Sequence, residues 1–258
     1  MQRGEDIMKF MRKVKDFLYP SVCISCHDVM RKNSNGVMCG VCKRKWLIAK
    51  QAVRLFLRGF PAIPFEIEDA GYNSESFIAS VVNYRSMTIE EGFAVQKRVI
   101  FELKRHGFKR LVDFLSDELY DLILETMPDT RDFSNFVIVS IPRHPKNYIF
   151  GAHDGVRDIG ISLAERMNCI YLPALSKPLF AKEQKNLDYL ERISNNEIFV
   201  KKDYRKKLYK KRVIIIDDVV TTGASVKSAA SDIMKSCRAK SVYVYSLAQS
   251  SDLLFRDL

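Results

Sequence analysis

The chain has 258 residues, 47% of them hydrophobic and 28% charged, which is typical of a folded globular protein and excludes extended disorder. Its net charge of +11 at pH 7 favours anionic partners such as nucleic acid, an anionic membrane surface or phosphorylated ligands. The sequence contains no run of about 18 apolar residues and no export signal, so we expect no membrane insertion and a cytoplasmic location. The length predicts one full-sized domain and a smaller module.

Residues 1–19 place apolar side chains at helical spacing, with basic residues between them. This pattern predicts a short amphipathic helix ahead of the first cysteine. A helix of this kind usually packs on its neighbouring module with its basic face in solvent, and less often contacts a membrane or nucleic acid.

Two Cys-x-x-Cys pairs come next, Cys23 with Cys26 and Cys39 with Cys42. Two intervening residues let both thiolates of a tight turn face one ion, and two such turns complete a tetrahedral four-sulfur site. A redox role would leave the second pair unexplained, and His27 is an alternative ligand that four thiolates make unnecessary. The spacing therefore predicts a structural zinc site.

The prolines that end residues 47–65 interrupt helical structure and predict a connector. We therefore divide the chain into residues 1–65, which hold the amphipathic helix, the zinc module and the connector, and a main domain over residues 66–258.

In the main domain, apolar runs that predict strands alternate with helical patterns. We expect strands over residues 77–84, 136–141, 213–216 and 242–247. Helices are expected over residues 89–106, from Gly107 to about Glu125, and over residues 156–167 and 225–235. This alternation predicts an α/β fold with a mostly parallel sheet flanked by helices, in which ligands bind at the carboxyl ends of the strands.

An acidic pair follows the apolar run at residues 213–216, which would place Asp217 and Asp218 at the carboxyl end of a central strand. Burying such a pair is costly without a ligand or partner. The chain then turns into a helix whose N-terminus, hydroxyl groups and glycine suit a bound phosphate. The residues of this turn are Val219, Val220, Thr221, Thr222, Gly223, Ala224 and Ser225.

Residues 213–225 resemble the loop of type I phosphoribosyltransferases that binds 5-phosphoribosyl-1-pyrophosphate (PRPP), where an acidic pair precedes Thr-Thr-Gly-x-Ser. The resemblance implies that Asp217 and Asp218 meet the ribose hydroxyls, directly or through magnesium and water. It also implies that residues 221–225 cradle the 5-phosphate, and that the sheet has the type I phosphoribosyltransferase arrangement.

With its four cysteines, most of the chain is similar to ComF-type competence proteins, which combine a zinc module with this loop. This similarity assigns further contacts with the pyrophosphate, or within a flexible segment that closes over it, to Lys104, Arg143, His144, Lys146, Gln184 and Arg192. The family's Arg-Gly-Phe-Asn-Gln stretch keeps only its glycine in residues 150–154, which puts catalysis in doubt.

Two functions follow from the resemblance. The first is a phosphoribosyltransferase, in the glycosyltransferase class, whose acceptor is unknown because Thr221 stands where purine salvage relatives have an aspartate base. The alternative is a PRPP-binding protein that handles single-stranded DNA during DNA uptake, without turnover. It rests on the basic residues 201–212 with Tyr204 and Tyr209, which suit single-stranded DNA but equally a solvated edge. A homo-oligomer and a partner in the competence machinery both stay open.

Overall fold

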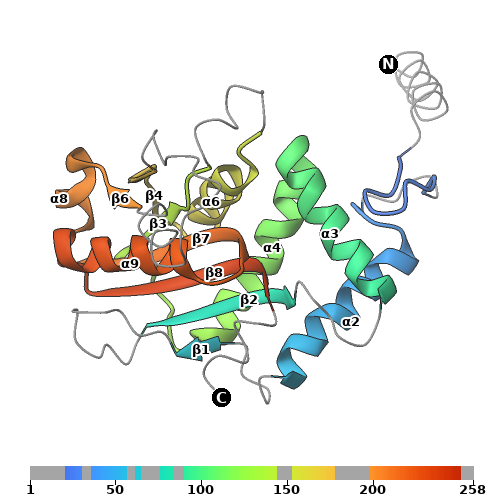
Figure 1. Ribbon diagram of the computed structural model, residues 1–258, viewed down its shortest axis with the longest axis horizontal. Coiled ribbons are helices and arrows are strands. Elements are labelled where there is room, and N and C mark those ends of the chain that lie inside the picture. The colour runs from blue at the N-terminus through green and yellow to red at the C-terminus, as the bar shows by residue number, and fades with distance from the viewer. Residues whose placement is uncertain are drawn as a thin grey trace, which may run out of the picture.

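The computed structural model describes residues 21–30, 36–56, 62–64, 76–83, 90–143, 153–177 and 198–250. Its main sheet has six strands in the order β1-β2-β8-β7-β3-β4 (Figure 1). Strand β1 pairs antiparallel with β2, and the other neighbouring strands of this sheet run parallel. The expected mostly parallel α/β sheet is therefore confirmed.

The expected strands and helices of the main domain are present, and most bounds are close to those predicted, although β7 extends four residues beyond its predicted end. The strands of the main sheet are β1 (Ala62–Pro64), β2 (Phe77–Asn83), β3 (Phe136–Ser140), β4 (Ile170–Tyr171), β7 (Arg212–Val220) and β8 (Ser241–Gln249). The helices are α2 (Gly40–Phe56), α3 (Glu90–Arg105), α4 (Lys109–Thr126), α6 (Gly155–Arg166), α8 (Arg205–Leu208) and α9 (Ala224–Cys237). Strands β5 (Leu175–Ser176) and β6 (Phe199–Val200) form a separate antiparallel pair.

Alternating side chains of the central strand β7 enter two different cores. Val213 and Ile215 pack with the apolar face of α9, whereas Ile214 and Ile216 belong to a core that includes residues of α2, α3, α4 and α6. In Figure 1, α9 accordingly lies along β7 and β8, and α4 passes behind the sheet. Helices on both faces explain why the strands are almost continuously apolar.

Helix α2 occupies part of the segment where the sequence predicted a connector. It begins directly after Cys39 and buries Cys42, Trp46, Ala49 and Val53 on one face, while basic residues such as Lys43 and Arg44 are exposed. The Trp46 ring lies edge-on to Phe114 of α4, with the ring centroids 5.7 Å apart. The helix was missed because Leu47 and Ile48 are apolar but exposed, which blurs the apolar periodicity of the buried face.

Ion pairs add to this packing between α2 and α4. Lys50 Nζ lies 2.7 Å from Glu118 Oε2, and Arg54 bonds to Glu125 through two of its nitrogens. One buried core contains Cys23 and Cys42 together with residues of α3 and α4.

Two further points concern the helix expected near the N-terminus and the expectation that no segment crosses a membrane. The amphipathic helix expected over residues 1–19 lies outside the described residues. Across the described ranges, none of the helices combines the length and apolar character needed to cross a membrane.

Candidate functional site

The acidic pair lies inside strand β7 and not beyond its end. The sequence predicted a strand that stops at Ile216, but β7 continues to Val220. Asp217, Val219 and Val220 are paired with residues of β8, so the ladder between the two parallel strands outweighs the low strand propensity of aspartate. The carboxylates still lie near the carboxyl end of the sheet, within the last four residues of a central strand.

The turn after β7 leads directly into α9. Thr221 and Thr222 are exposed, and Gly223 has a left-handed backbone with φ of 76°. Residues with a Cβ adopt this conformation at a cost, so the glycine is required by the turn. The N–H of Ala224 donates to Thr222 Oγ1 at 3.4 Å, at the start of a helix whose first N–H groups favour anions.

One basic residue contacts this acidic pair, and a second basic residue is bonded to the first. Lys104, in the last turn of α3, lies with its Nζ 3.0 Å from Asp218 Oδ2. Arg143, just beyond β3, donates from Nη1 to the carbonyl oxygen of Lys104 at 3.0 Å. Its Nη2 is buried and has no hydrogen-bond partner among the described residues, so it has a donor left for an anion. Of the residues expected near the pyrophosphate, Lys104 therefore contacts the acidic pair and Arg143 is bonded to Lys104.

The two carboxylates differ in their surroundings. Asp217 Oδ1 accepts a hydrogen bond from the N–H of Asp218 at 2.8 Å. Asp217 keeps a little exposed area but is densely surrounded by protein atoms. This burial, with the nearby charge of Asp218, raises the pKa of Asp217 to about 7, although the Asp218 N–H, Lys177 and Lys104 act in the opposite direction. Burial also lowers the pKa of Lys177 despite its acidic neighbours. This lysine follows β5, and its place beside the pair was not predicted.

The raised pKa of Asp217 predicts a pH-dependent cost to stability. A free aspartate titrates near pH 4, so between about pH 4 and 7 the folded chain binds this proton more tightly than the unfolded chain. The contribution of Asp217 to stability is therefore present below pH 4 and is lost as the pH rises through 7. We expect Asp217→Asn to raise the free energy of unfolding more at pH 8 than at pH 5, by on the order of 1 kcal/mol.

Urea denaturation at the two pH values measures this difference. Asp113→Asn, on the outer surface of α4, is the matched control and should change stability equally little at both. An effect of Asp217→Asn that does not vary with pH would contradict a raised pKa at this position.

The stretch that departs from the ComF-type pattern has local structural roles where it is described. Asp154 caps α6 by accepting a hydrogen bond from the N–H of Arg157 at 3.2 Å. His153 Nε2 lies 2.7 Å from Asp158 Oδ2, and its ring packs so closely on Gly107 that a Cβ there would come within 1.7 Å of it. The other expected contacts at His144, Lys146, Gln184 and Arg192 lie outside the described residues and stay predictions.

A buried pair of serines beside Asp217 was also missed. Ser246 of β8 is the register partner of both Asp217 and Ser80, and the Ser80 and Ser246 hydroxyl oxygens lie 2.6 Å apart. Ser246 also donates to the carbonyl oxygen of Ala248 at 3.0 Å. The signal in the sequence was a serine interrupting each of two apolar strands. These groups extend the polar region under the loop across three neighbouring strands.

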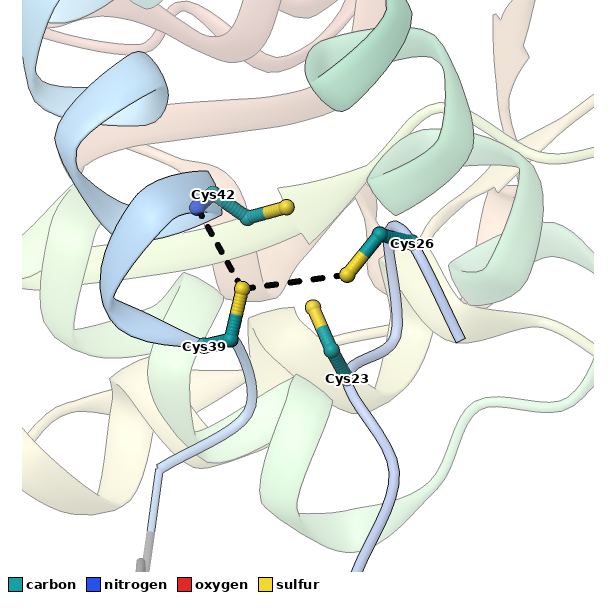
Figure 2. A group of neighbouring side chains, drawn as sticks. All are labelled: Cys23, Cys26, Cys39 and Cys42. Carbon is teal, nitrogen blue, oxygen red and sulfur yellow. Dashed lines mark hydrogen bonds between the residues drawn. The ribbon is translucent and has the colours of Figure 1, made fainter. Parts of the chain in front are cut away.

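The four cysteines of the two Cys-x-x-Cys pairs converge, as predicted. Figure 2 shows their sulfur atoms facing one another, and all four lie within 4.8 Å of each other. Cys26 Sγ and Cys39 Sγ are 3.7 Å apart, far beyond the 2.05 Å of a disulfide. Zinc–sulfur bonds of about 2.3 Å in a tetrahedron separate the sulfurs by about 3.8 Å. The cluster therefore fits one tetrahedral metal ion, and His27 is not part of it.

The backbone around the cluster favours thiolates. Burial raises the pKa of Cys23, but hydrogen bonds from the backbone of Cys26, Cys39 and Ser25 outweigh it and bring the pKa down to about 7. A backbone hydrogen bond lowers the pKa of Cys26, but burial and neighbouring side chains, the other thiols among them, outweigh it and raise this pKa. Burial also raises the pKa of Cys42. The N–H of Cys42 points to Cys39 Sγ at 3.5 Å. N–H groups directed at the sulfurs are suited to ligands that bind a metal as anions.

Similarity to known proteins is confined to solved structures. The sequence matches no protein-family model and no curated protein. Among solved structures, 16 chains match. One of them is adenine phosphoribosyltransferase from Saccharomyces cerevisiae, complexed with an imino-altritol bisphosphate and adenine. It is 13% identical, the match covers 82% of this chain and 94% of that one, and the TM-score is 0.34. A score this low transfers no feature from one chain to the other.

Proposed function

We propose that this chain is a PRPP-binding, phosphoribosyltransferase-like protein of the ComF type, located in the cytoplasm. The observation that carries the proposal is the acidic pair Asp217 and Asp218, which precedes the left-handed Gly223 at the start of α9. A sugar with a phosphate and a pyrophosphate needs hydrogen-bond acceptors for its hydroxyls and donors for its anionic groups. The carboxyl end of β7 and the turn after it offer both.

Each part of the ligand has candidate partners in this arrangement. Asp217 and Asp218 would bind the ribose hydroxyls or a magnesium ion, which prefers carboxylate and phosphate oxygens. The turn at residues 221–225 would hold the 5-phosphate through hydroxyl and N–H groups. Arg143 and Lys104 are the cations for the pyrophosphate, and Lys104 would leave Asp218 when magnesium takes its place.

Calorimetric titration of the full chain with PRPP and magnesium tests this function. We expect saturable binding with a dissociation constant below about 1 mM, the upper end of common KM values. Ribose 5-phosphate, which lacks the pyrophosphate, should bind more weakly, and omission of magnesium should weaken PRPP. Affinity for PRPP equal to that for ribose 5-phosphate, or no binding, would overturn the proposal. Release of pyrophosphate in a screen of nucleobases would identify a transferase.

A basic surface at the amino ends of β7 and β8, opposite the acidic pair, supports the second candidate, binding of single-stranded DNA. The N–H of Lys210 donates to the Arg238 carbonyl at 3.1 Å, and that of Lys240 donates to the Lys211 carbonyl at 2.8 Å. These bonds bring a second basic segment alongside residues 201–212. Ammonium groups also lie over two aromatic rings, 5.4 Å from the partly buried Tyr204 and 5.2 Å from the exposed Tyr209. Phosphates and stacked bases fit such a surface.

Neutralising this surface should weaken DNA binding. We expect the triple variant Lys206→Gln, Lys207→Gln, Lys210→Gln to lower the affinity for an oligothymidine and to reduce the slope of log affinity against log salt by about 2. Fluorescence anisotropy at several salt concentrations measures both quantities. Three neutralised residues elsewhere, Lys43, Arg44 and Lys109, form the control. Equal losses in the two variants would indicate attraction by overall charge alone and would remove this candidate.

A further inference from the structure

Helix α3 contacts the four-cysteine cluster near its middle and the acidic pair at its end. Arg98 Nη1 donates at 2.6 Å to the carbonyl oxygen of Ser25, which lies between Cys23 and Cys26. Further along the same helix, Lys104 Nζ pairs with Asp218 Oδ2 at 3.0 Å. With a rise of 1.5 Å per residue, about 9 Å of helix separates these two side chains. One rigid element therefore touches both candidate sites.

Both contacts are fixed by further packing. At the cysteine end, Val95 and Val99 of α3 share a buried core with Cys23 and Cys42, and Ser25 is itself buried. At the other end, Arg143 holds the carbonyl oxygen of Lys104, as described above. The carbonyl oxygen of Leu103 would be only 2.8 Å from a Cβ on Gly155, so α3 and α6 are in close contact there. A shift of α3 at either end would disturb these contacts at the other, since packed interiors transmit strain.

We propose that Arg98 is a positioning residue that couples the metal-bound state of the four cysteines to ligand affinity at Asp217 and Asp218. A metal held by Cys23 and Cys26 fixes the turn between them and thereby the direction of the Ser25 carbonyl. Because Arg98 is hydrogen-bonded to that carbonyl, the turn restrains the position of Arg98. The rigid helix α3 transmits this positional restraint to Lys104. For the identity of the ligand, this inference rests on the proposed function. The contact between α3 and the cysteine turn does not depend on it.

Linkage requires the effect to be reciprocal, because a metal that strengthens PRPP binding is itself bound more tightly in the presence of PRPP, by the same factor. In the wild-type chain, we expect PRPP with magnesium to increase the affinity for zinc by a factor of about 5 to 10. Competition with a chelator, with and without PRPP and magnesium, measures zinc affinity. Arg98→Met should bring the factor close to 1, whereas Arg98→Lys, which retains a donor, should recover part of it. Arg105→Met, on the exposed surface of the same helix, is the control and should keep the full factor.

Hydrogen exchange provides a second measurement that needs no PRPP. Removal of zinc from the wild-type chain should speed exchange in the last turn of α3, over residues 102–105, and Arg98→Met should show fast exchange there even with zinc bound. Exchange in this turn that is the same with and without zinc would overturn the coupling. A wild-type chain that fails to bind PRPP but shows the zinc-dependent exchange would refute the proposed function and leave the coupling supported.

Discussion

The double variant Asp217→Asn, Asp218→Asn is expected to lose at least about 100-fold in affinity for PRPP with magnesium. Each carboxylate is expected to make a charge-assisted hydrogen bond or a metal bond, and such hydrogen bonds contribute about 1.5 to 3 kcal/mol apiece. Asparagine keeps the shape of the side chain but removes the charge that attracts magnesium. Calorimetry under identical conditions for the two proteins measures the loss.

This loss would not be a consequence of unfolding. Asp217 is costly to bury in its charged form, so its replacement should leave stability equal or higher at neutral pH. Lys104 loses its partner but has 43% of its side chain exposed, so water can solvate it. The matched control exchanges Asp113 and Asp117, on the outer surface of α4, for asparagine. Unchanged affinity in the Asp217, Asp218 variant would show that the acidic pair does not bind the ligand.

Cys39→Ser should remove the metal from the chain. The Cys39 sulfur lies 3.7 Å from Cys26 Sγ and 3.5 Å from the backbone nitrogen of Cys42, so it is part of the cluster. A serine hydroxyl is a far weaker ligand for zinc than a thiolate, and structural zinc sites contribute directly to folding. We expect one zinc per wild-type chain, close to none in the variant, and a loss of several kcal/mol in the free energy of unfolding.

Elemental analysis and thermal unfolding, each with and without a chelator, measure these effects. Cys169→Ser is the control, because Cys169 is also a free and partly buried thiol but lies outside the cluster. It should retain the metal. A Cys39→Ser protein with wild-type zinc content, or a metal-free wild type of unchanged stability, would refute a structural metal site.

Much of the fold was predictable because its patterns are local. The apolar runs in β3 and β7 reflect burial on both faces, and the two Cys-x-x-Cys turns specify their geometry within a few residues. The extension of β7 to Val220 was not predictable, since the pairing of Asp217 with Ser246 depends on a neighbouring strand.

The charges around the acidic pair were harder to predict than the pair itself. The family resemblance assigned Lys104 to the pyrophosphate, but its contact with Asp218 joins segments that are distant in sequence. Lys177 was not among the residues that the resemblance assigned to the site. Such contacts follow from the order of strands in the sheet, and no local pattern encodes that order.

The packing of α2 on α4 gives the protein an internal optical probe. Trp46 is the chain's single tryptophan, is almost fully buried, and follows Cys42 by one helical turn. Its indole Nε1 has no hydrogen-bond partner among the described residues. Its fluorescence should therefore be blue-shifted in the folded chain and move to longer wavelength when water reaches the α2–α4 contact. Followed beside the circular dichroism of the sheet, this single emission band would distinguish release of the cysteine module from unfolding of the whole protein.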